Sequence, residues 1–291
     1  MSLINAWSTP TSVHAIRFDR VTKSFDGRRV LDRVSFDVAR GKACCIMGRS
    51  GSGKSVTLKL LLGLLKPDEG EIYVNDVQIE ALDSARLVEV RKTIGFLFQY
   101  SALFDSLSVA ENVAFPLRRH TSMSEAEIAG SVHERLAGVG LEDELDKMPL
   151  DLSGGMRKRV GLARALALKP SILLVDEPSS GLDPITTREI DKLLIDLKSS
   201  SNTTMVVVTH NVPSARRIGD QLVVLHEGHI IAQGTAKELD QSEDEVVRQF
   251  MSSEDERAVN AIPTRSVSAI AETSVIERSH QETEVEYGVH G

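Results

Sequence analysis

Apolar and polar residues alternate along the first part of the chain and then give way to short runs that are almost wholly apolar. The alternation starts at Val13 and ends at Val38, interrupted by Asp26-Gly27, a pair typical of a tight turn. A similar stretch covers residues 71–79 and contains an Asn-Asp turn signal. Because successive side chains of a strand face opposite sides of a sheet, both stretches predict antiparallel strands.

The apolar runs predict a second kind of sheet. Residues 43–47, 172–175 and 204–209 are short and apolar, which is typical of parallel strands buried on both faces. Further strands, including a hairpin around Glu227-Gly228, are predicted at residues 91–98, 222–225 and 229–232.

Helical periodicity separates these strands. The predicted helices cover residues 56–65, 109–117, 128–139, 157–169 and 186–198. Strands that alternate with helices predict an α/β fold with a parallel sheet. Helical patterns punctuated by Gly and Pro fill residues 101–150, which predicts a helical insert between two parts of one core.

Charge and composition exclude some functions. The net charge of −8 and the isoelectric point near 5.6 argue against a general nucleic-acid binder, because neutralising phosphates needs a basic surface. We see no secretory signal and no apolar run near the roughly 18 residues of a membrane span, so we expect a soluble chain that needs a partner for any membrane role. The adjacent Cys44 and Cys45 suit buried apolar positions in a reducing compartment.

The strand predicted at residues 43–47 runs into a glycine-rich loop, and an apolar helix pattern leaves it at Val56. This strand–loop–helix context supports a phosphate-binding loop, in which backbone N–H groups and a helix N-terminus surround phosphate oxygens. Lys54 would reach the β- and γ-phosphates and the Ser55 hydroxyl would ligate Mg²⁺. The loop consists of Gly48, Arg49, Ser50, Gly51, Ser52, Gly53, Lys54 and Ser55, and Val56 directly after it is predicted to join the nucleotide-binding residues.

Two carboxylates follow the apolar run 172–175 directly. In a phosphate-loop protein, Asp176 at such a strand end holds Mg²⁺, directly or through water. Glu177 is placed to polarise the attacking water as a general base. The alternative is an acidic surface turn, but residues of buried type lead straight into the paired charges, a poor place for them without a cation.

Two more polar side chains come after strands. His210 ends the run 204–209 and should lie at the same sheet edge as Asp176. A lone histidine is more often structural, but this position facing a phosphate site favours a functional role. Gln99 follows the strand predicted at residues 91–98 and could sense the metal or the attacking water.

A second glycine-rich helix start lies further along the chain. Ser153, Gly154 and Gly155 precede the helix predicted over residues 157–169, which gives a second anion-binding geometry. Alone, this signal is weak. Phe25, just before the first turn, could stack on an adenine ring or pack in the core, and periodicity favours the core.

Residues 13–240 resemble the ATPase subunits of ABC transporters, because the motifs occur in that family's order. They match the Walker A loop at residues 48–55, the Q-loop at Gln99, the signature at 152–156, the Walker B strand at 175–178, the D-loop at 181–183 and the H-loop at His210. The resemblance implies a P-loop NTPase core with an antiparallel β subdomain and an inserted α-helical subdomain. It implies ATP and Mg²⁺ as cofactors, with Ser55, Gln99 and Asp176 at the metal.

The same resemblance implies a head-to-tail homodimer with two ATP sites. In each site, Lys54 and Asp176 of one copy would face Ser153 and Gly155 of the other. Asp183, in the D-loop, would join the nucleotide-binding residues. Phe25 gains weight as the adenine-stacking residue; the family more often has Tyr there, but stacking needs only the ring.

A narrower resemblance concerns the cargo. Residues 101–117 and 153–165 are similar to the ATPases of Mla-type transporters, which move phospholipids between the membranes of diderm bacteria with MCE-domain proteins. This implies a position on the cytoplasmic face of the inner membrane, a permease that docks near residues 100–118, and a small STAS-type subunit. Alternatively, Leu103, Phe104, Leu107 and Val109 are simply packing residues.

Other members of the family offer competing functions. The chain could serve another cargo, such as an amino acid or an exported lipid. A soluble ATPase of DNA repair or translation ranks lower, since the insert is short, the cassette single and the charge acidic. A catalytically dead cassette is opposed by the presence of Lys54, Asp176, Glu177 and His210. We predict a lead-in over residues 1–12, an ATPase domain over 13–240, and an extension over 241–291 that is partly disordered or docked on a partner.

Overall fold

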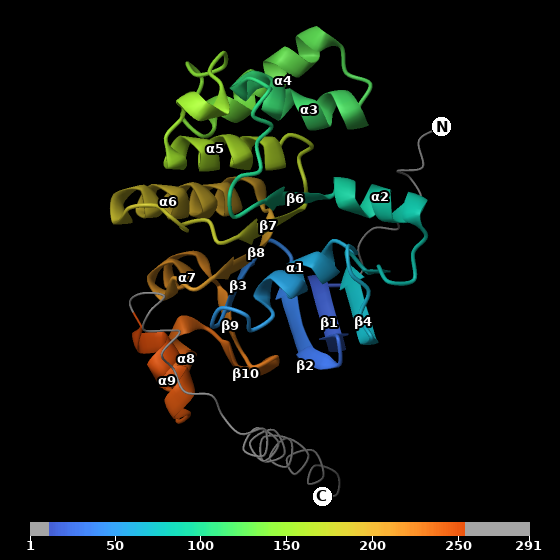
Figure 1. Cartoon of the computed structure of the whole chain (residues 1–291), viewed down its shortest axis with the longest axis vertical. Helices are drawn as coiled ribbons and strands as arrows, with labels where there is room; N and C mark the ends of the chain where they lie inside the picture. Colours follow the sequence, from blue (N-terminus) through green and yellow to red (C-terminus); the bar gives the residue numbers. More distant parts are fainter. Residues whose placement is uncertain (1–11, 254–291) are drawn as a thin grey trace, which may run out of the picture.

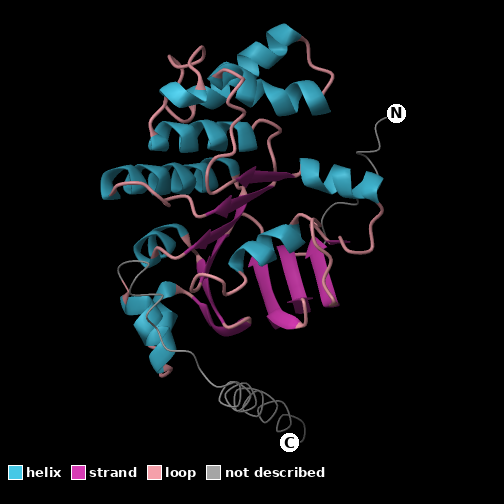
Figure 2. Ribbon diagram, viewed as in Figure 1, coloured by secondary structure: helices cyan, strands magenta, loops and turns pink. Residues whose placement is uncertain are grey.

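Two β-sheets of different kinds lie at the centre of the structure, a computed structural model that describes residues 12–253 (Figures 1 and 2). The first sheet has four antiparallel strands in the order β2-β1-β4-β5. Its strands are β1 (His14–Phe25), β2 (Arg28–Ala39), β4 (Glu69–Val74) and β5 (Val77–Gln78). The two predicted turns join them, with positive φ angles of 50° at Asp26, 78° at Gly27, 49° at Asn75 and 68° at Asp76.

The second sheet has six strands in the order β10-β9-β3-β8-β7-β6. All of its neighbouring pairs are parallel except β9 and β10, which form the predicted hairpin at one edge. Its strands are β3 (Ala43–Met47), β6 (Ile94–Leu97), β7 (Ile172–Asp176), β8 (Thr204–Thr209), β9 (Gln221–His226) and β10 (His229–Gly234). The carboxyl ends of the parallel strands therefore meet at one edge of this sheet.

Helices surround the parallel sheet, and three of them form a separate group on the side remote from the antiparallel sheet (Figure 1). These three are α3 (Val109–His120), α4 (Glu125–Ala137) and α5 (Gly154–Ala165). Ser108 and Ser124 begin α3 and α4 with capping boxes, which satisfy backbone N–H groups of the first turn. The remaining helices are α1 (Lys54–Leu61), α2 (Ser84–Lys92), α6 (Pro184–Ser201), α7 (Val212–Ile218), α8 (Ala236–Asp240) and α9 (Glu245–Ser252).

One predicted strand was wrong at its start. The sequence predicted a strand over residues 91–98, but Arg91 and Lys92 form the last turn of α2, and the strand begins at Ile94. Arg91 donates hydrogen bonds to the carbonyl oxygens of Leu62 and Gly63, at 2.8 and 3.1 Å. This tertiary contact is invisible in a local pattern.

Helix boundaries also differ from the predicted ones. Helix α1 ends at Leu61 rather than at residue 65, because the chain turns at Gly63 with φ of 60°. Helix α5 begins at Gly154, three residues before the predicted start, since Ser153 caps it. Helices α2, α7, α8 and α9 were not predicted.

The parallel sheet and its helices enclose a core that extends beyond residue 240, where the sequence analysis placed the start of the extension. Val247 and Phe250 of α9 are fully buried in this core, so α9 packs on the chain itself. Residues 1–11 and 254–291 lie outside the described residues, and the division into lead-in, domain and extension stays a prediction. Between residues 12 and 253, the structure has no helix that is both long and apolar enough to cross a membrane.

Candidate nucleotide site

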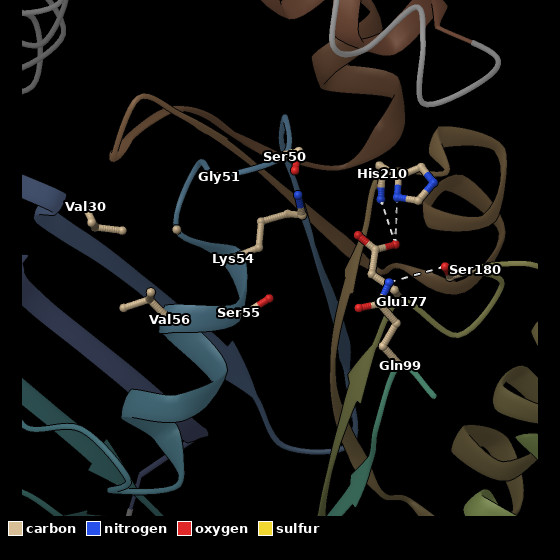
Figure 3. Close-up of a pocket in the computed structure, with 11 residues that line it drawn as sticks. Val30, Ser50, Gly51, Lys54, Ser55, Val56, Gln99, Glu177, Ser180 and His210 are labelled. Carbon is tan, nitrogen blue, oxygen red and sulfur yellow. Dashed lines mark hydrogen bonds and ion pairs between the residues drawn. The ribbon is translucent and has the colours of Figure 1, made fainter. Parts of the chain in front are cut away.

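A cavity of about 370 Å³ opens at the carboxyl edge of the parallel sheet (Figure 3). The loop between β3 and α1 forms one wall, and residues that follow β6, β7 and β8 form the opposite wall. The cavity is lined by Val30, Ser50, Gly51, Gly53, Lys54, Ser55, Val56, Gln99, Glu177, Ser180 and His210.

The glycine-rich loop holds its lysine in place before any ligand is considered. Lys54 is buried, and its ammonium donates hydrogen bonds to the carbonyl oxygens of Gly48 at 2.8 Å and Arg49 at 3.0 Å. Gly53 has φ of 107°, and a Cβ there would lie 2.9 Å from the Val30 carbonyl oxygen, so only glycine fits. The α1 N-terminus and one positive charge therefore face the cavity, an arrangement that suits an anion.

Glu177 faces this loop from the other wall (Figure 3). His210 Nδ1 lies 2.9 Å from the Glu177 carboxylate, and the His210 backbone N–H donates to the same oxygen at 3.3 Å. The backbone N–H of Glu177 donates to the Val208 carbonyl oxygen at 2.9 Å. Glu177 has φ of 46°, a conformation that is uncommon outside glycine and is held here by neighbouring strands.

Asp176 ends β7 just behind this wall. Its Oδ1 atom is buried and makes no hydrogen bond within residues 12–253. Burial raises the pKa of Asp176, and the nearby Glu177 charge adds to the rise, whereas Lys54 and Lys158 oppose it. A buried carboxylate oxygen without a hydrogen-bond partner fits the oxygen ligands that Mg²⁺ prefers.

Gln99 and Ser180 complete the far wall. The Gln99 side-chain amide donates to the Ser180 hydroxyl at 3.3 Å. Behind them, the buried Lys158 of α5 donates to the carbonyl oxygens of Gln99 and Glu177. Burial lowers the pKa of Lys158 to about 8, against the raising effect of Asp176 and Glu177.

The signature residues lie elsewhere. Ser153, Gly154 and Gly155 do not line the cavity. The Ser153 hydroxyl caps α5 by accepting from the Met156 backbone N–H at 3.2 Å. A Cβ on Gly155 would lie 2.5 Å from the Thr186 side chain, so this helix start packs beside the start of α6.

Asp183 and Phe25 also lie outside the cavity. Asp183 caps α6 by accepting from the Ile185 and Thr186 backbone N–H groups at 2.9 and 3.0 Å, and its hydrogen bonds with Thr186 lower its pKa. Phe25 is 40% exposed at the end of β1, with the Lys23 ammonium 5.5 Å from its ring centroid, and is not a core residue. Periodicity alone therefore favoured the wrong environment for Phe25.

A separate groove of about 400 Å³ lies beside the helical group. Phe104 and Phe115 are 43% and 46% exposed there, with ring centroids 4.8 Å apart. Val109, in contrast, is fully buried, and Leu103 packs against the core. The segment after Gln99 thus contains both packing residues and an exposed apolar face.

Sequence reasoning missed three residues around the cavity: Val30, Ser180 and Lys158. Ser180 lies between two predicted motifs, at residues 175–178 and 181–183, and this position was the only available signal. Val30 comes from a different sheet, and Lys158 is one of several basic residues on its helix, so no local pattern singled them out.

The chain is similar to known proteins in both sequence and fold. The family model described as ABC transporter matches residues 31–180. MlaF of Escherichia coli K12, named as an intermembrane phospholipid transport system ATP-binding protein, is 43% identical over 77% of this chain and 83% of its own length. The "Probable ribonucleotide transport ATP-binding protein mkl" of Mycobacterium leprae is 41% identical over 91% of this chain and 77% of its own.

A solved structure resembles the fold closely. It is a dimeric ATP-binding cassette in a post-hydrolysis state with ADP and Pi bound, and it matches with a TM-score of 0.70 and 36% identity. The match covers 76% of this chain and 98% of the cassette.

Proposed function

The chain belongs to the ABC transporter family of ATP-binding proteins, and we propose that it powers phospholipid transport between two membranes. It is an ATPase, as its family membership and its likeness to a cassette bound to ADP and Pi indicate. The observation that carries the ATP chemistry is the cavity in which Lys54 and Ser55 face the Glu177–His210 pair. Phosphate-binding groups and a candidate base meet there across a space open to solvent.

The two walls of the cavity have different roles in phosphoryl transfer. The loop N–H groups and Lys54 bind the phosphates, with the Lys54 ammonium turning from the Gly48 and Arg49 carbonyls toward them. Glu177 accepts a proton from the attacking water, and His210 holds the carboxylate in position. Gln99, bonded to Ser180, orients water or metal from the side.

Ser55 and Asp176 would hold Mg²⁺, with Gln99 near it. The cation would neutralise charge on the phosphate oxygens during transfer. The unpartnered Oδ1 of Asp176 supports this assignment, because a buried carboxylate oxygen without a partner is costly unless a cation binds it.

The working unit is a homodimer in which the signature of one copy closes the cavity of the other. Ser153 and Gly155 lie outside their own chain's cavity but at a helix N-terminus suited to an anion. A head-to-tail pair related by two-fold symmetry would use both surfaces twice. Asp183 and Phe25 would join the nucleotide in that closed state, Phe25 by stacking its exposed ring.

The groove that contains Phe104 and Phe115 is the candidate docking surface for a permease. Two exposed aromatic rings beside each other are unusual on a free surface and typical of a binding site. The chain would then lie on the cytoplasmic face of the inner membrane as a peripheral subunit. An MCE-domain protein and a small STAS-type subunit complete the proposed assembly.

The phospholipid cargo rests on the relatives named MlaF. A ribonucleotide is a second candidate cargo, favoured by the name of the mycobacterial relative. The ATP chemistry would be the same for both, so partner and ligand decide between them.

The test is purification of the tagged full chain from detergent-solubilised native membranes, with bound proteins and lipids identified by mass spectrometry. We expect a permease, an MCE-domain protein and phospholipid. Recovery of ribonucleotides other than ATP and ADP, identified in the same samples, without lipid would favour the second candidate, and a solute-binding protein without an MCE partner would point to another cargo.

A groove variant makes this test specific. Phe104→Glu places a charge in the apolar groove and should lose the permease while still binding ATP. Val88→Glu is the matched control, because Val88 is similarly exposed but lies on α2, outside the groove. Equal loss of the permease in both variants would remove the groove from its docking role.

A further inference from the structure

The side chain of Lys158 connects three parts of the ATPase that are far apart in sequence. It is 4% exposed and projects from α5, the helix that begins at the signature. Its ammonium donates to the Gln99 carbonyl oxygen and, at 3.2 Å, to the Glu177 carbonyl oxygen. One side chain therefore joins the signature helix to the loops that follow β6 and β7.

The backbone that Lys158 holds at Glu177 is in an uncommon conformation. Glu177 has φ of 46°, and such residues keep this conformation only when their surroundings fix it. The Glu177 N–H is fixed by Val208 and the carboxylate by His210. Lys158 fixes the third group, the carbonyl, so without it the residue could relax and shift its carboxylate.

The loop after Gln99 is held by the same helix. Arg164 of α5 donates to the carbonyl oxygens of Ser101 at 2.6 Å and Ala102 at 2.8 Å. Gly161 brings the helix close, since a Cβ there would lie 3.2 Å from the Ser101 Cβ. Arg164 and Ala102 also line the aromatic groove, so contacts run continuously from that groove to Glu177.

We propose that Lys158 is a positioning residue for ATP hydrolysis, which fixes Glu177 and the Gln99 loop to the signature helix so that they move as one unit. The inference rests on the proposed function, in which Glu177 is the general base. It assigns Lys158 no contact with nucleotide. Its effect should therefore fall on turnover rather than on ATP binding.

The test compares three full-length variants for steady-state turnover, KM for ATP and thermal unfolding. Lys158→Met removes the ammonium but keeps an unbranched chain that suits a buried slot. Lys158→Arg retains a cation that can donate to both carbonyls. Lys192→Met is the control, because Lys192 is exposed on α6.

We expect Lys158→Met to lower kcat at least about tenfold with KM changed less than about twofold, the signature of a lost transition-state interaction. Lys158→Arg should recover part of the loss, and Lys192→Met should match the native chain. A kcat unchanged by Lys158→Met, or a loss explained by unfolding at the assay temperature, would overturn the proposal.

A double-mutant cycle with Glu177→Gln asks whether Lys158 acts through Glu177. In single-turnover assays, Lys158→Met should lower the hydrolysis rate less than about twofold when Glu177 is already Gln. The reason is that residues that act as one unit do not have additive effects. The same fold reduction in rate in the native and the Glu177→Gln backgrounds would mean that Lys158 acts independently of Glu177, which contradicts the proposal.

Amide hydrogen exchange gives a reading that does not need turnover. Lys158→Met should raise exchange at residues 99–102 and 177–180 and leave the middle of α6 unchanged. If the native chain showed no ATPase activity, the proposed function would fail, but this exchange pattern would still decide whether Lys158 holds the two loops. Unchanged exchange at both loops would refute the positioning role.

Discussion

The chain contains two glycine-rich helix starts, and their surroundings are opposite. The start of α1 faces a cavity and is opposed by Glu177 and His210 from the same chain. The start of α5 does not line that cavity and packs beside α6. Both present backbone N–H groups of the kind that bind anions, but only the first has candidate catalytic groups opposite it within one copy.

This difference assigns a separate task to each helix start. In the proposed function, the α1 start binds ATP in a single chain. In that same proposal, the α5 start completes a site on a second chain, so damage there should affect dimer closure and turnover and leave binding intact. The following variants test this division.

Glu177→Gln should have the largest effect. It should lower turnover by roughly 10²–10⁴-fold, the usual contribution of a general base, while ATP affinity stays close to native. The bound ATP should then trap a dimer. Phosphate release, equilibrium binding and size-exclusion chromatography measure the three quantities, and robust hydrolysis would remove Glu177 from the base role.

Lys54→Ala should weaken ATP binding by the single chain. Hydrogen bonds to charged groups contribute about 1.5–3 kcal/mol each, so the affinity should fall roughly tenfold to hundredfold. Lys59→Ala is the matched control on an exposed position of the same helix. Equal binding by the Lys54 and Lys59 variants, measured by titration calorimetry, would contradict the assigned role of the loop.

Ser153→Arg should leave ATP binding by the single chain within about twofold of native but lower turnover at least about tenfold, because a bulky cation blocks closure of the second copy. Thermal unfolding should show a folded chain. The contrast with Lys54→Ala is the sharpest functional test of the comparison. Normal ATP-driven dimerisation of this variant would show that the α5 start is not part of a composite site.

The smallest expected effects are on stability without nucleotide or Mg²⁺. Asp176→Asn should stabilise the chain slightly, because it removes a charge that partial burial and the neighbouring Glu177 make unfavourable. Ser153→Ala should destabilise it by about 1 kcal/mol through loss of the α5 cap. Urea denaturation with a chelator measures both.

The pH dependence of the unfolding free energy separates the effect of the Asp176 charge from the effect of the Ser153 cap. The folded-state pKa of Asp176 is raised, so the native carboxyl is a source of instability at neutral pH, where it is ionised, and this cost disappears as pH falls and the group is protonated. The stability gained by Asp176→Asn should therefore shrink as the pH falls, whereas the stability lost by Ser153→Ala should not change with pH. A gain from Asn that is constant with pH would place the cause in packing.

The predictable parts of the molecule are those fixed by local pattern. The loop between β3 and α1, the turn at Asp26-Gly27 and the strand that ends at Asp176 follow from residue order alone. The strand predicted from residue 91 failed because Arg91 is held in α2 by contacts with residues 62 and 63. Lys158 and Ser180 were missed because their roles exist only once distant loops meet.

The central claim, that each site is shared between two copies, can be tested directly by cross-linking. Ser50→Cys places a thiol on the exposed side of the first cavity wall, and Ser153→Cys places one at the α5 start. The native Cys44 and Cys45 are fully buried and should not react. A mixture of the two variants, treated with a short bifunctional maleimide, should give a covalent dimer only when ATP is present, and neither variant alone should do so. No dimer from the mixture with ATP, or equal dimer without nucleotide, would contradict the shared site.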